Sequence, residues 1–100
     1  MPIMVIISKA ILKQFFDKYP AASRPVLEWY GKVKEADWGN FSELRKMFPA
    51  TDAVGNDLYI FNIGGRKYRL IARIFFSVRT VYIRFIGTHV EYDRVSLSDL

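Results

Sequence analysis

The sequence of 100 residues has no cysteine and only one histidine, His89. Without cysteine, neither a disulfide framework nor a thiolate zinc site can form, and a single histidine excludes a multi-histidine metal site. The acidic residues show no spacing typical of a paired-carboxylate glycosidase or a magnesium site. A phosphate loop and a nucleophile elbow are also absent.

Long hydrophobic runs are absent too. The longest wholly apolar run, 1–7, is far shorter than the roughly 20 residues that a membrane helix needs, and no cation precedes it as in a secretion signal. We expect a buried first strand there and a cytoplasmic location. Repeats and long linkers are missing, and 51% of the residues are hydrophobic, which predicts a single domain over 1–100.

Acidic residues are missing from 58–90, although the whole chain carries 10 of them against 15 basic residues, for a net charge of +5. The cations in this stretch are Arg66, Lys67, Arg69, Arg73, Arg79 and Arg84. Their mutual repulsion goes unrelieved unless an anion binds. The distribution favours an anionic partner such as RNA, DNA or an acidic protein surface, although many inert domains are also basic.

Apolar periodicity predicts helices in the first half of the chain. Ser8 is the expected cap of the first helix, and Asn40 with Glu43 has the form of a capping box at the start of the third. The expected helices cover 9–18, 21–35 and 40–47.

The second half is rich in β-branched and aromatic residues and predicts three strands. Gly64-Gly65 indicates a tight turn with antiparallel pairing, because glycine tolerates positive φ angles. The expected strands cover 58–63, 67–76 and 81–87. Helices followed by strands favour the α+β class.

Alternation within these strands predicts two different faces of a sheet. The apolar face would carry Tyr59, Phe61, Ile63, Tyr68, Leu70, Ala72, Ile74, Phe76, Val81, Ile83 and Phe85. The other face would carry Asn62, Lys67, Arg69, Arg73, Tyr82 and Arg84, interrupted by Leu58, Ile60, Ile71 and Ile86. Such a face is often merely solvated, but solvated faces normally mix Glu with Lys and this one contains no acid.

The only histidine follows the last strand. Thr88 and Glu91 have capping-box spacing, so a final helical turn would place His89 and Tyr92 on adjacent positions. A lone histidine is usually structural. Beside clustered arginines, however, it can act as an acid or base on RNA while the guanidinium groups bind phosphate oxygens.

The order of several short motifs in the second half resembles the HigB toxin family. They are Asn62-Ile63-Gly64-Gly65, Tyr68-Arg69-Leu70, Phe75-Phe76, Tyr82-Ile83-Arg84 and Thr88-His89-Val90-Glu91-Tyr92-Asp93. The resemblance is densest over 48–93 and reaches more weakly to 18–20. It implies a RelE-like fold, in which an N-terminal strand and two to three helices pack on one face of a twisted antiparallel sheet, with a short C-terminal helical turn.

The resemblance also implies ribosome-dependent cleavage of mRNA in the decoding site without a metal or an organic cofactor, and a HigA-like helix-turn-helix antitoxin as partner. Arg69 and Arg84 resemble the family's phosphate-binding arginines, and His89 and Tyr92 its catalytic corner. The predicted catalytic residues are therefore His89, Arg69, Arg84 and Tyr92. Asp93 could orient His89 or cap the helix. The predicted RNA-binding residues are Arg66, Lys67, Arg73, Tyr82 and Asn62.

Two other interpretations stay open at this stage. The first is a RelE-like module that binds RNA or the antitoxin but has lost catalysis. The second is an interaction domain whose basic face docks an acidic protein.

Overall fold

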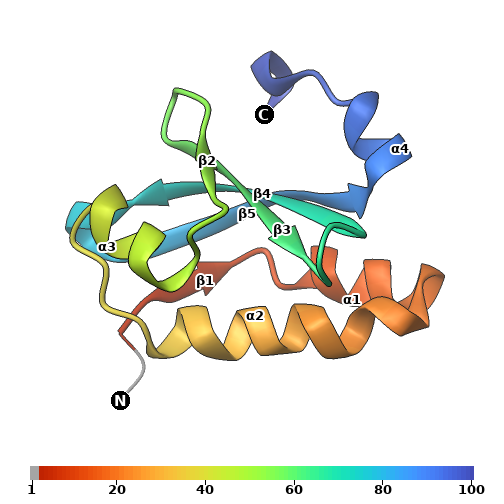
Figure 1. The fold of residues 1–100 in the computed structure, drawn as a ribbon, viewed down its shortest axis with the longest axis horizontal. Helices are drawn as coiled ribbons and strands as arrows, with labels where there is room; N and C mark the ends of the chain where they lie inside the picture. The colour runs from red at the N-terminus through yellow and green to blue at the C-terminus, as the bar shows by residue number, and fades with distance from the viewer. Residues whose placement is uncertain (1–2) are drawn as a thin grey trace.

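The computed structural model describes residues 3–100 and contains a five-stranded sheet with helices below it (Figure 1). The spatial order of the strands is β1-β5-β4-β3-β2. Their bounds are β1 Val5–Ile7, β2 Asp52–Ala53, β3 Leu58–Ile63, β4 Tyr68–Phe75 and β5 Thr80–Thr88. The three strands that sequence patterning predicted in the second half are confirmed, and the very short β2 is an addition.

The sheet is mixed, which corrects the expectation of an antiparallel one. β1 runs parallel to β5, pairing Val5 with Thr80 and Ile7 with Tyr82, whereas all other neighbouring strands are antiparallel. A parallel partner needs a long connection, and β1 reaches β5 only after the chain has passed through all the other strands. Of the first strand expected over 1–7, the structure shows Val5–Ile7 as β-strand; residues 1 and 2 lie outside the described part.

The helices are α1 Ala10–Lys18, α2 Ser23–Glu35, α3 Phe41–Met47 and α4 His89–Asp93, with short 3-10 turns at Pro20–Ala22, Phe76–Val78 and Leu97–Asp99. Asn40 caps α3 as expected by accepting from the Glu43 N–H at 2.9 Å. The prediction for Ser8 was wrong, because this residue has a φ of 75° and α1 begins after Lys9 without a side-chain cap.

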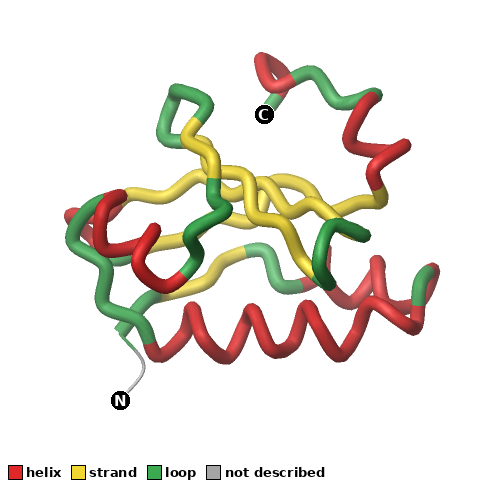
Figure 2. Tube along the Cα trace, viewed as in Figure 1, coloured by secondary structure: helices red, strands yellow, loops and turns green. Residues whose placement is uncertain are grey.

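The main core fills the space between the sheet and the helix layer, which Figure 2 shows as α1 and α2 beneath the strands. Trp29 of α2 packs edge-on against Phe61 of β3 with ring centroids 5.2 Å apart. Side chains of α1, α2, α3 and four strands contribute to this core, as expected for the apolar face of the sheet.

The turn between β3 and β4 confirms the prediction that Gly64 and Gly65 adopt positive φ angles. Gly64 and Gly65 have φ angles of 63° and 69°, which other residues adopt only with strain. Ile63 pairs with Tyr68, so the turn contains four residues and includes Lys67. Lys67 was expected on a strand; instead it lies exposed in this turn.

A bulge in β5 changes the predicted faces beyond Ile83. Ala72 pairs with Ile83 and Ile71 with Phe85, so Arg84 is an extra residue without a partner on β4. The prediction for the next two residues was therefore wrong. Ile86 is buried in the main core, and Phe85 packs on the opposite face of the sheet.

That opposite face is not an open basic surface. Leu58, Ile60 and Ile71 form a second apolar cluster that is covered by Phe85, Tyr92, Val95, Leu97 and Leu100. The chain after α4 turns back above the strands, toward the loop beyond β2 (Figure 1). We call residues 94–100 the tail and this side of the sheet the tail face.

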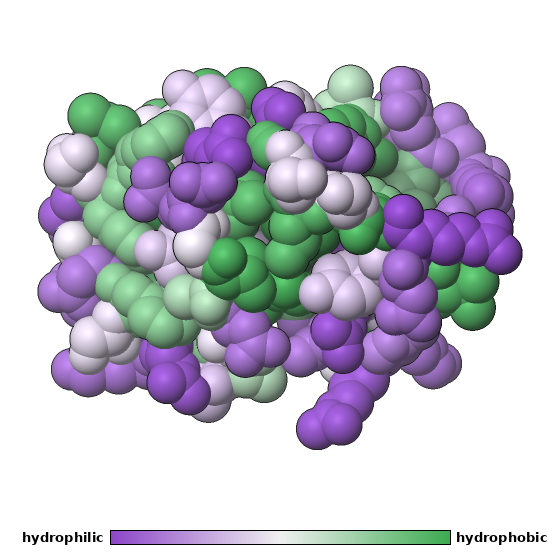
Figure 3. Space-filling model, turned by 90° about the horizontal axis from the view of Figure 1, so that it is seen from above, coloured by the Kyte–Doolittle hydropathy of each residue, from purple (hydrophilic) through white to green (hydrophobic). Residues whose placement is uncertain are grey.

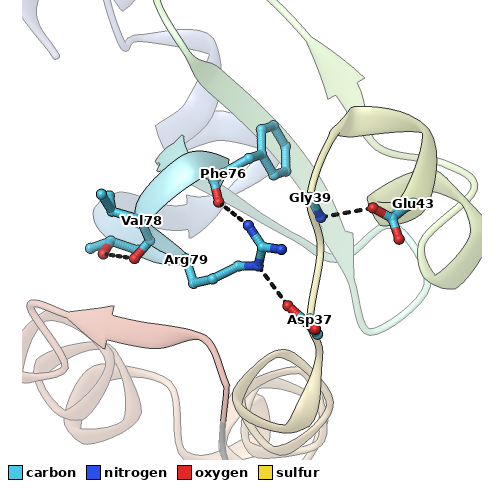
Figure 4. Close-up of polar contacts among 7 residues, drawn as sticks. Asp37, Gly39, Glu43, Phe76, Val78 and Arg79 are labelled. Carbon is cyan, nitrogen blue, oxygen red and sulfur yellow. Dashed lines mark hydrogen bonds and ion pairs between the residues drawn. The ribbon is translucent and has the colours of Figure 1, made fainter.

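One of the cations in the acid-free stretch is neutralised from the first half of the chain. Figure 4 shows Arg79 between Asp37 and the carbonyl of Phe76. Its Nε donates to Asp37 Oδ1 and its Nη1 to the Phe76 carbonyl, each at 2.6 Å. Repulsion at Arg79 is thus relieved within the chain, contrary to the expectation that only a bound anion would relieve it.

Candidate active site

Three strands bring a polar row together on the tail face. Arg69 of β4 pairs with Asn62 of β3 on one side and with Gly87 of β5 on the other. Directly paired residues direct their side chains to the same face of a sheet, with Cβ atoms about 5 Å apart. Asn62 and Arg69 are therefore neighbours, and the position on the other side of Arg69 carries no side chain.

The guanidinium group of Arg69 stacks on an aromatic ring and has no anionic partner. Its Cζ atom lies 4.7 Å from the centroid of the Tyr92 ring. Its buried Nε has no hydrogen-bond partner, and no carboxylate among residues 3–100 forms an ion pair with it. A guanidinium held on a ring face but not neutralised is suited to bind a phosphate.

The side-chain amide of Asn62 already makes one hydrogen bond to the neighbouring loop. Its Nδ2 donates to the carbonyl of Ala50 at 3.4 Å, while its buried Oδ1 has no partner. This acceptor and the unpaired Nε of Arg69 lie on directly paired residues, so the row retains both a donor and an acceptor that the described residues do not satisfy.

The helix that carries His89 and Tyr92 starts at the end of this row. Thr88 and Glu91 form the predicted capping box: the Thr88 N–H donates to Glu91 Oε1 at 2.9 Å, and the Glu91 N–H to Thr88 Oγ1 at 3.3 Å. His89 is half-buried at the first position of α4, two residues after Gly87. Spacing of three along a helix places His89 and Tyr92 side by side. We call Arg69, His89 and Tyr92 the Arg69 corner.

An ion pair with α1 anchors the same helix. Lys18 Nζ lies 3.1 Å from Glu91 Oε2. The hydrogen bond from the Thr88 N–H lowers the pKa of Glu91, burial opposes this shift, and the Lys18 ammonium supports it. The Glu91 carboxylate in turn raises the pKa of Lys18. Both groups are therefore charged around neutral pH, and they link α4 to the helix layer.

Gly87 allows this anchoring because it has no side chain. A Cβ at this position would lie 2.5 Å from Phe85 Cζ and 3.0 Å from Glu91 Cβ. Both distances are too short for unstrained packing. Glycine thus lets the aromatic ring of Phe85 and the first turn of α4 approach the strand beside Arg69.

The other predicted site residues do not all reach this corner. Arg66 and Lys67 lie exposed in the turn before β4, at the same end of the sheet. Arg84 is the exposed bulge residue, and among residues 3–100 no hydrogen bond, ion pair or ring contact joins it to the Arg69 corner. Its predicted place beside Arg69 thus has no contact to support it.

Arg73 and Tyr82 form a second polar row farther along the sheet. They pair directly with each other, and Arg73 Nε donates to the Asn56 carbonyl at 3.1 Å. Arg73 lies four positions along β4 from Arg69, which corresponds to a distance of about 13 Å at a rise of 3.3 Å per residue. The row Ile60, Ile71 and Phe85 lies between them under the tail, so the tail face is not the continuous basic surface that alternation predicted.

Sequence reasoning missed two parts of this arrangement. Lys18 and Glu91 are 73 residues apart, and nothing local in the sequence indicates their contact. The tail was also missed, although its apolar residues Val95, Leu97 and Leu100 were a signal that this end of the chain packs on the protein.

The tail face combines an apolar middle with a hydrophilic end. Figure 3 views it from above, and hydrophilic side chains gather at its right end, where α4 lies in Figure 1. Within 3–100, no three side chains of His, Asp or Glu come close enough to hold a metal ion together. Over the same residues, no helix is both long and apolar enough to span a membrane.

The fold and the corner define a class: a RelE-like α+β protein with an unneutralised arginine at the edge of a short C-terminal helix. Comparison with known families makes this specific. Residues 22–95 match the family model of HigB_toxin, described as the RelE-like toxic component of a toxin-antitoxin system. The chain belongs to this family, as its motif order suggested.

Individual relatives are similar in sequence to this chain over most of its length. A protein named mRNA interferase HigB from Escherichia coli O6:H1 strain CFT073 is 34% identical over 95 residues, which cover 93% of this chain and 92% of the relative. The mRNA interferase toxin HigB of Escherichia coli K12 is 30% identical over 92 residues, covering 90% and 88%. An mRNA interferase HigB from Shigella flexneri shows the same values.

Proposed function

We propose that this chain is an endoribonuclease toxin that cleaves mRNA in the decoding site of the ribosome without a metal ion. The observation that carries the proposal is the Arg69 corner: an arginine that stacks on Tyr92 and has no carboxylate partner among residues 3–100, with the single histidine of the chain three residues before Tyr92 on α4. Family membership and relatives named as mRNA interferases support the same activity. Action on ribosomes implies a cytoplasmic location.

The reaction would be an attack of a ribose 2′-oxygen on the adjacent phosphorus. A base removes the 2′-hydroxyl proton, the 2′-O–P bond forms, the P–O5′ bond breaks, and an acid gives a proton to the leaving 5′-oxygen. The products are a 2′,3′-cyclic phosphate and a 5′-hydroxyl end. We assign His89 to proton transfer, since imidazole can act as acid or base near neutral pH.

Arg69 would bind the scissile phosphate and stabilise the charge that develops on its oxygens. Stacking on Tyr92 fixes the guanidinium plane before RNA arrives, so little order is lost on binding. Tyr92 itself would stack on a base or transfer a proton, and Arg84 would be a second clamp that approaches the phosphate once RNA is bound.

The remaining cations and polar groups would hold the RNA strand. Arg66 and Lys67 lie at the same end of the sheet as Arg69 and would bind phosphates next to the cleaved one. Asn62 offers a free amide oxygen beside Arg69. Arg73 and Tyr82 would form a separate contact beyond the tail. A HigA-like helix-turn-helix antitoxin is the proposed protein partner.

The test is a cleavage assay with defined components. Purified protein is incubated with 70S ribosomes programmed with a defined mRNA, in parallel with naked mRNA, and the 3′ ends are mapped. We expect cuts in the decoding site only with ribosomes, and a loss of about 10²- to 10⁴-fold in His89→Ala, the usual size of acid-base catalysis. Val90→Ala, the exposed neighbour in α4, is the control and should cut normally.

Other outcomes would redirect or refute the proposal. Cleavage that survives His89→Ala would transfer the proton-transfer role to Tyr92. Cleavage of naked mRNA at the same positions would remove the ribosome from the mechanism. A folded wild-type protein that binds ribosomes without cutting would contradict catalysis and leave a binding module.

A further inference from the structure

Exposed apolar side chains gather at the end of the tail face that is farthest from α4. Nine large hydrophobic side chains are exposed within 3–100, and four of them lie here. They are Val5, Ile7, Phe75 and Val78. We call these four residues the far patch. Soluble proteins normally scatter such side chains singly, so a cluster indicates an interaction surface.

Strand pairing shows that the far patch is one surface. Val5 of β1 and Phe75 of β4 both pair with Thr80 of β5, from opposite sides. Ile6 is buried in the main core, so Val5 and Ile7 face the other way, on the tail face. Phe75 contacts Tyr82 edge-on, with ring centroids 5.9 Å apart.

The turn between β4 and β5 continues this surface. Val78 is 63% exposed, and Figure 4 shows its side chain directed away from the Arg79 and Asp37 pair. β1 is one of the two edge strands of the sheet. An exposed apolar edge strand is prone to aggregation unless a partner covers it.

The composition of the far patch fits a protein better than RNA. Surfaces that bind RNA combine cations with exposed aromatic rings, whereas three of the four patch residues are aliphatic. The apolar row Ile60, Ile71 and Phe85, with the tail above it, also separates the patch from the Arg69 corner. The patch is thus not a continuation of the proposed cleavage site.

Charge indicates what kind of protein would bind. β1, β4 and β5 contain no carboxylate, and Arg73 lies on the tail face beside Tyr82, next to the patch. An acidic partner would be attracted to these strands, and an apolar segment of it would cover the patch. We propose that the far patch is the docking surface for the antitoxin, through an acidic segment with apolar side chains at its centre.

This inference rests on the proposed function, because a toxin needs a neutralising partner. It specifies where the antitoxin would bind the toxin and which side chains the contact would involve. A segment seated on Val5 and Phe75 would lie against Tyr82 and Arg73, which we propose as an RNA contact. Docking would therefore compete with that contact while leaving the Arg69 corner uncovered.

The experiment compares carboxylates introduced on and off the patch. Val5→Glu with Val78→Glu places two negative charges on the patch at residues 54% and 63% exposed. Leu27→Glu places one on α2 at a residue also 54% exposed, and serves as the matched control. Affinity is measured by calorimetry against the purified HigA-like helix-turn-helix antitoxin proposed as the partner.

We expect the patch variant to bind the antitoxin at least tenfold more weakly, and Leu27→Glu to stay within about twofold of the wild type, as surface changes away from a contact usually do. Both should cut mRNA like the wild type when no antitoxin is present. Wild-type affinity in the patch variant would overturn the proposal.

Two further readouts separate this proposal from its alternatives. If sedimentation shows that the wild type is a dimer and the patch variant a monomer with unchanged antitoxin affinity, the patch is a self-interface and the proposal fails. If the folded variant loses cleavage, the patch belongs to the RNA surface and the proposal also fails. A wild type that cuts no RNA, combined with weakened binding in the variant, would refute the proposed function but support the docking surface.

Discussion

The two ends of the tail face differ in how their side chains are restrained. At the Arg69 corner, polar groups are fixed by a ring contact, a capping box and an ion pair. At the far patch, apolar side chains such as Val5 and Val78 are exposed with few neighbours above them. Fixed polar groups suit chemistry, which requires pre-arranged charges, whereas exposed apolar groups suit a partner that supplies the missing packing.

The row of Ile60, Ile71 and Phe85 keeps these two ends apart. Ile71 has no exposed surface, and the tail above it leaves no polar path along β4 between Arg69 and Arg73. A single sheet face can therefore serve two partners, provided that the tail remains in place.

The largest expected effect is the loss of Arg69. Arg69→Ala should lower the rate of mRNA cleavage by about 10²- to 10³-fold, because removal of one transition-state donor usually costs this much. Antitoxin affinity should not change, since the far patch is untouched. Arg24→Ala, which removes an equal charge from exposed α2, should leave both quantities unchanged. Equal losses of cleavage in the two variants would show that only net charge matters.

The second prediction concerns the row between the two ends. Ile71→Ala should lower the free energy of unfolding by about 2 to 5 kcal/mol, the usual cost of truncating a buried isoleucine. Ile74→Ala is the matched control, because Ile74 is equally buried on β4 but belongs to the main core.

Hydrogen exchange of the tail distinguishes these two variants. Only Ile71→Ala should speed exchange of the amides in 94–100 beyond the change expected from global stability. Tail exchange that rises equally in both variants would indicate that the tail is held by the fold as a whole and not by this row.

The smallest effect concerns the ion pair that anchors α4. Glu91→Gln keeps an acceptor for the Thr88 N–H but removes the attraction to Lys18, so cleavage should fall only about twofold, as exposed ion pairs contribute little. Glu28→Gln, which alters a comparable exposed pair on α2, is the control and should have no effect on cleavage.

The pH dependence of this anchor follows from the two pKa shifts. The pKa of Glu91 is lowered, so its contribution is complete above the ordinary value of about 4.3 and is lost as the pH falls through the lowered value. The pKa of Lys18 is raised, so its contribution is complete below about 10.4 and is lost as the pH rises through the raised value. Chemical shifts of α4 should report both limits, and Glu91→Gln should abolish the acidic one and weaken the basic one, because the charge of Glu91 is the main cause of the raised pKa of Lys18.

Local sequence signals predicted those parts of the structure that local forces determine. The turn at Gly64-Gly65 depends on positive φ angles, and the start of α4 depends on side chains three residues apart, so both were visible in a few residues. The strands of the second half followed from alternation for the same reason.

The missed features depend on contacts between distant residues. Parallel pairing of β1 with β5 and the link between Lys18 and Glu91 join residues more than 70 positions apart. The bulge at Arg84 adds one residue to an otherwise regular strand, and the alternating pattern of β5 does not reveal it. The predicted site residues fall partly into each group: Arg69 contacts Tyr92, and His89 lies three residues before Tyr92 on α4, while Arg73 and Tyr82 lie beyond the tail.

The bulge at Arg84 shifts the alternation of side chains along β5 by one residue. In a regular β5 continued from Ile83, Gly87 would point toward the helix layer, and a side-chain-free position would no longer lie opposite Arg69. Whether Arg84 is accommodated as a bulge or in regular register thus decides on which side of the sheet α4 leaves β5. Deletion of Arg84 would leave a regular strand in which Phe85, Ile86 and Gly87 keep their faces and their partners on β4, so it would remove the cation without redirecting the helix that carries His89.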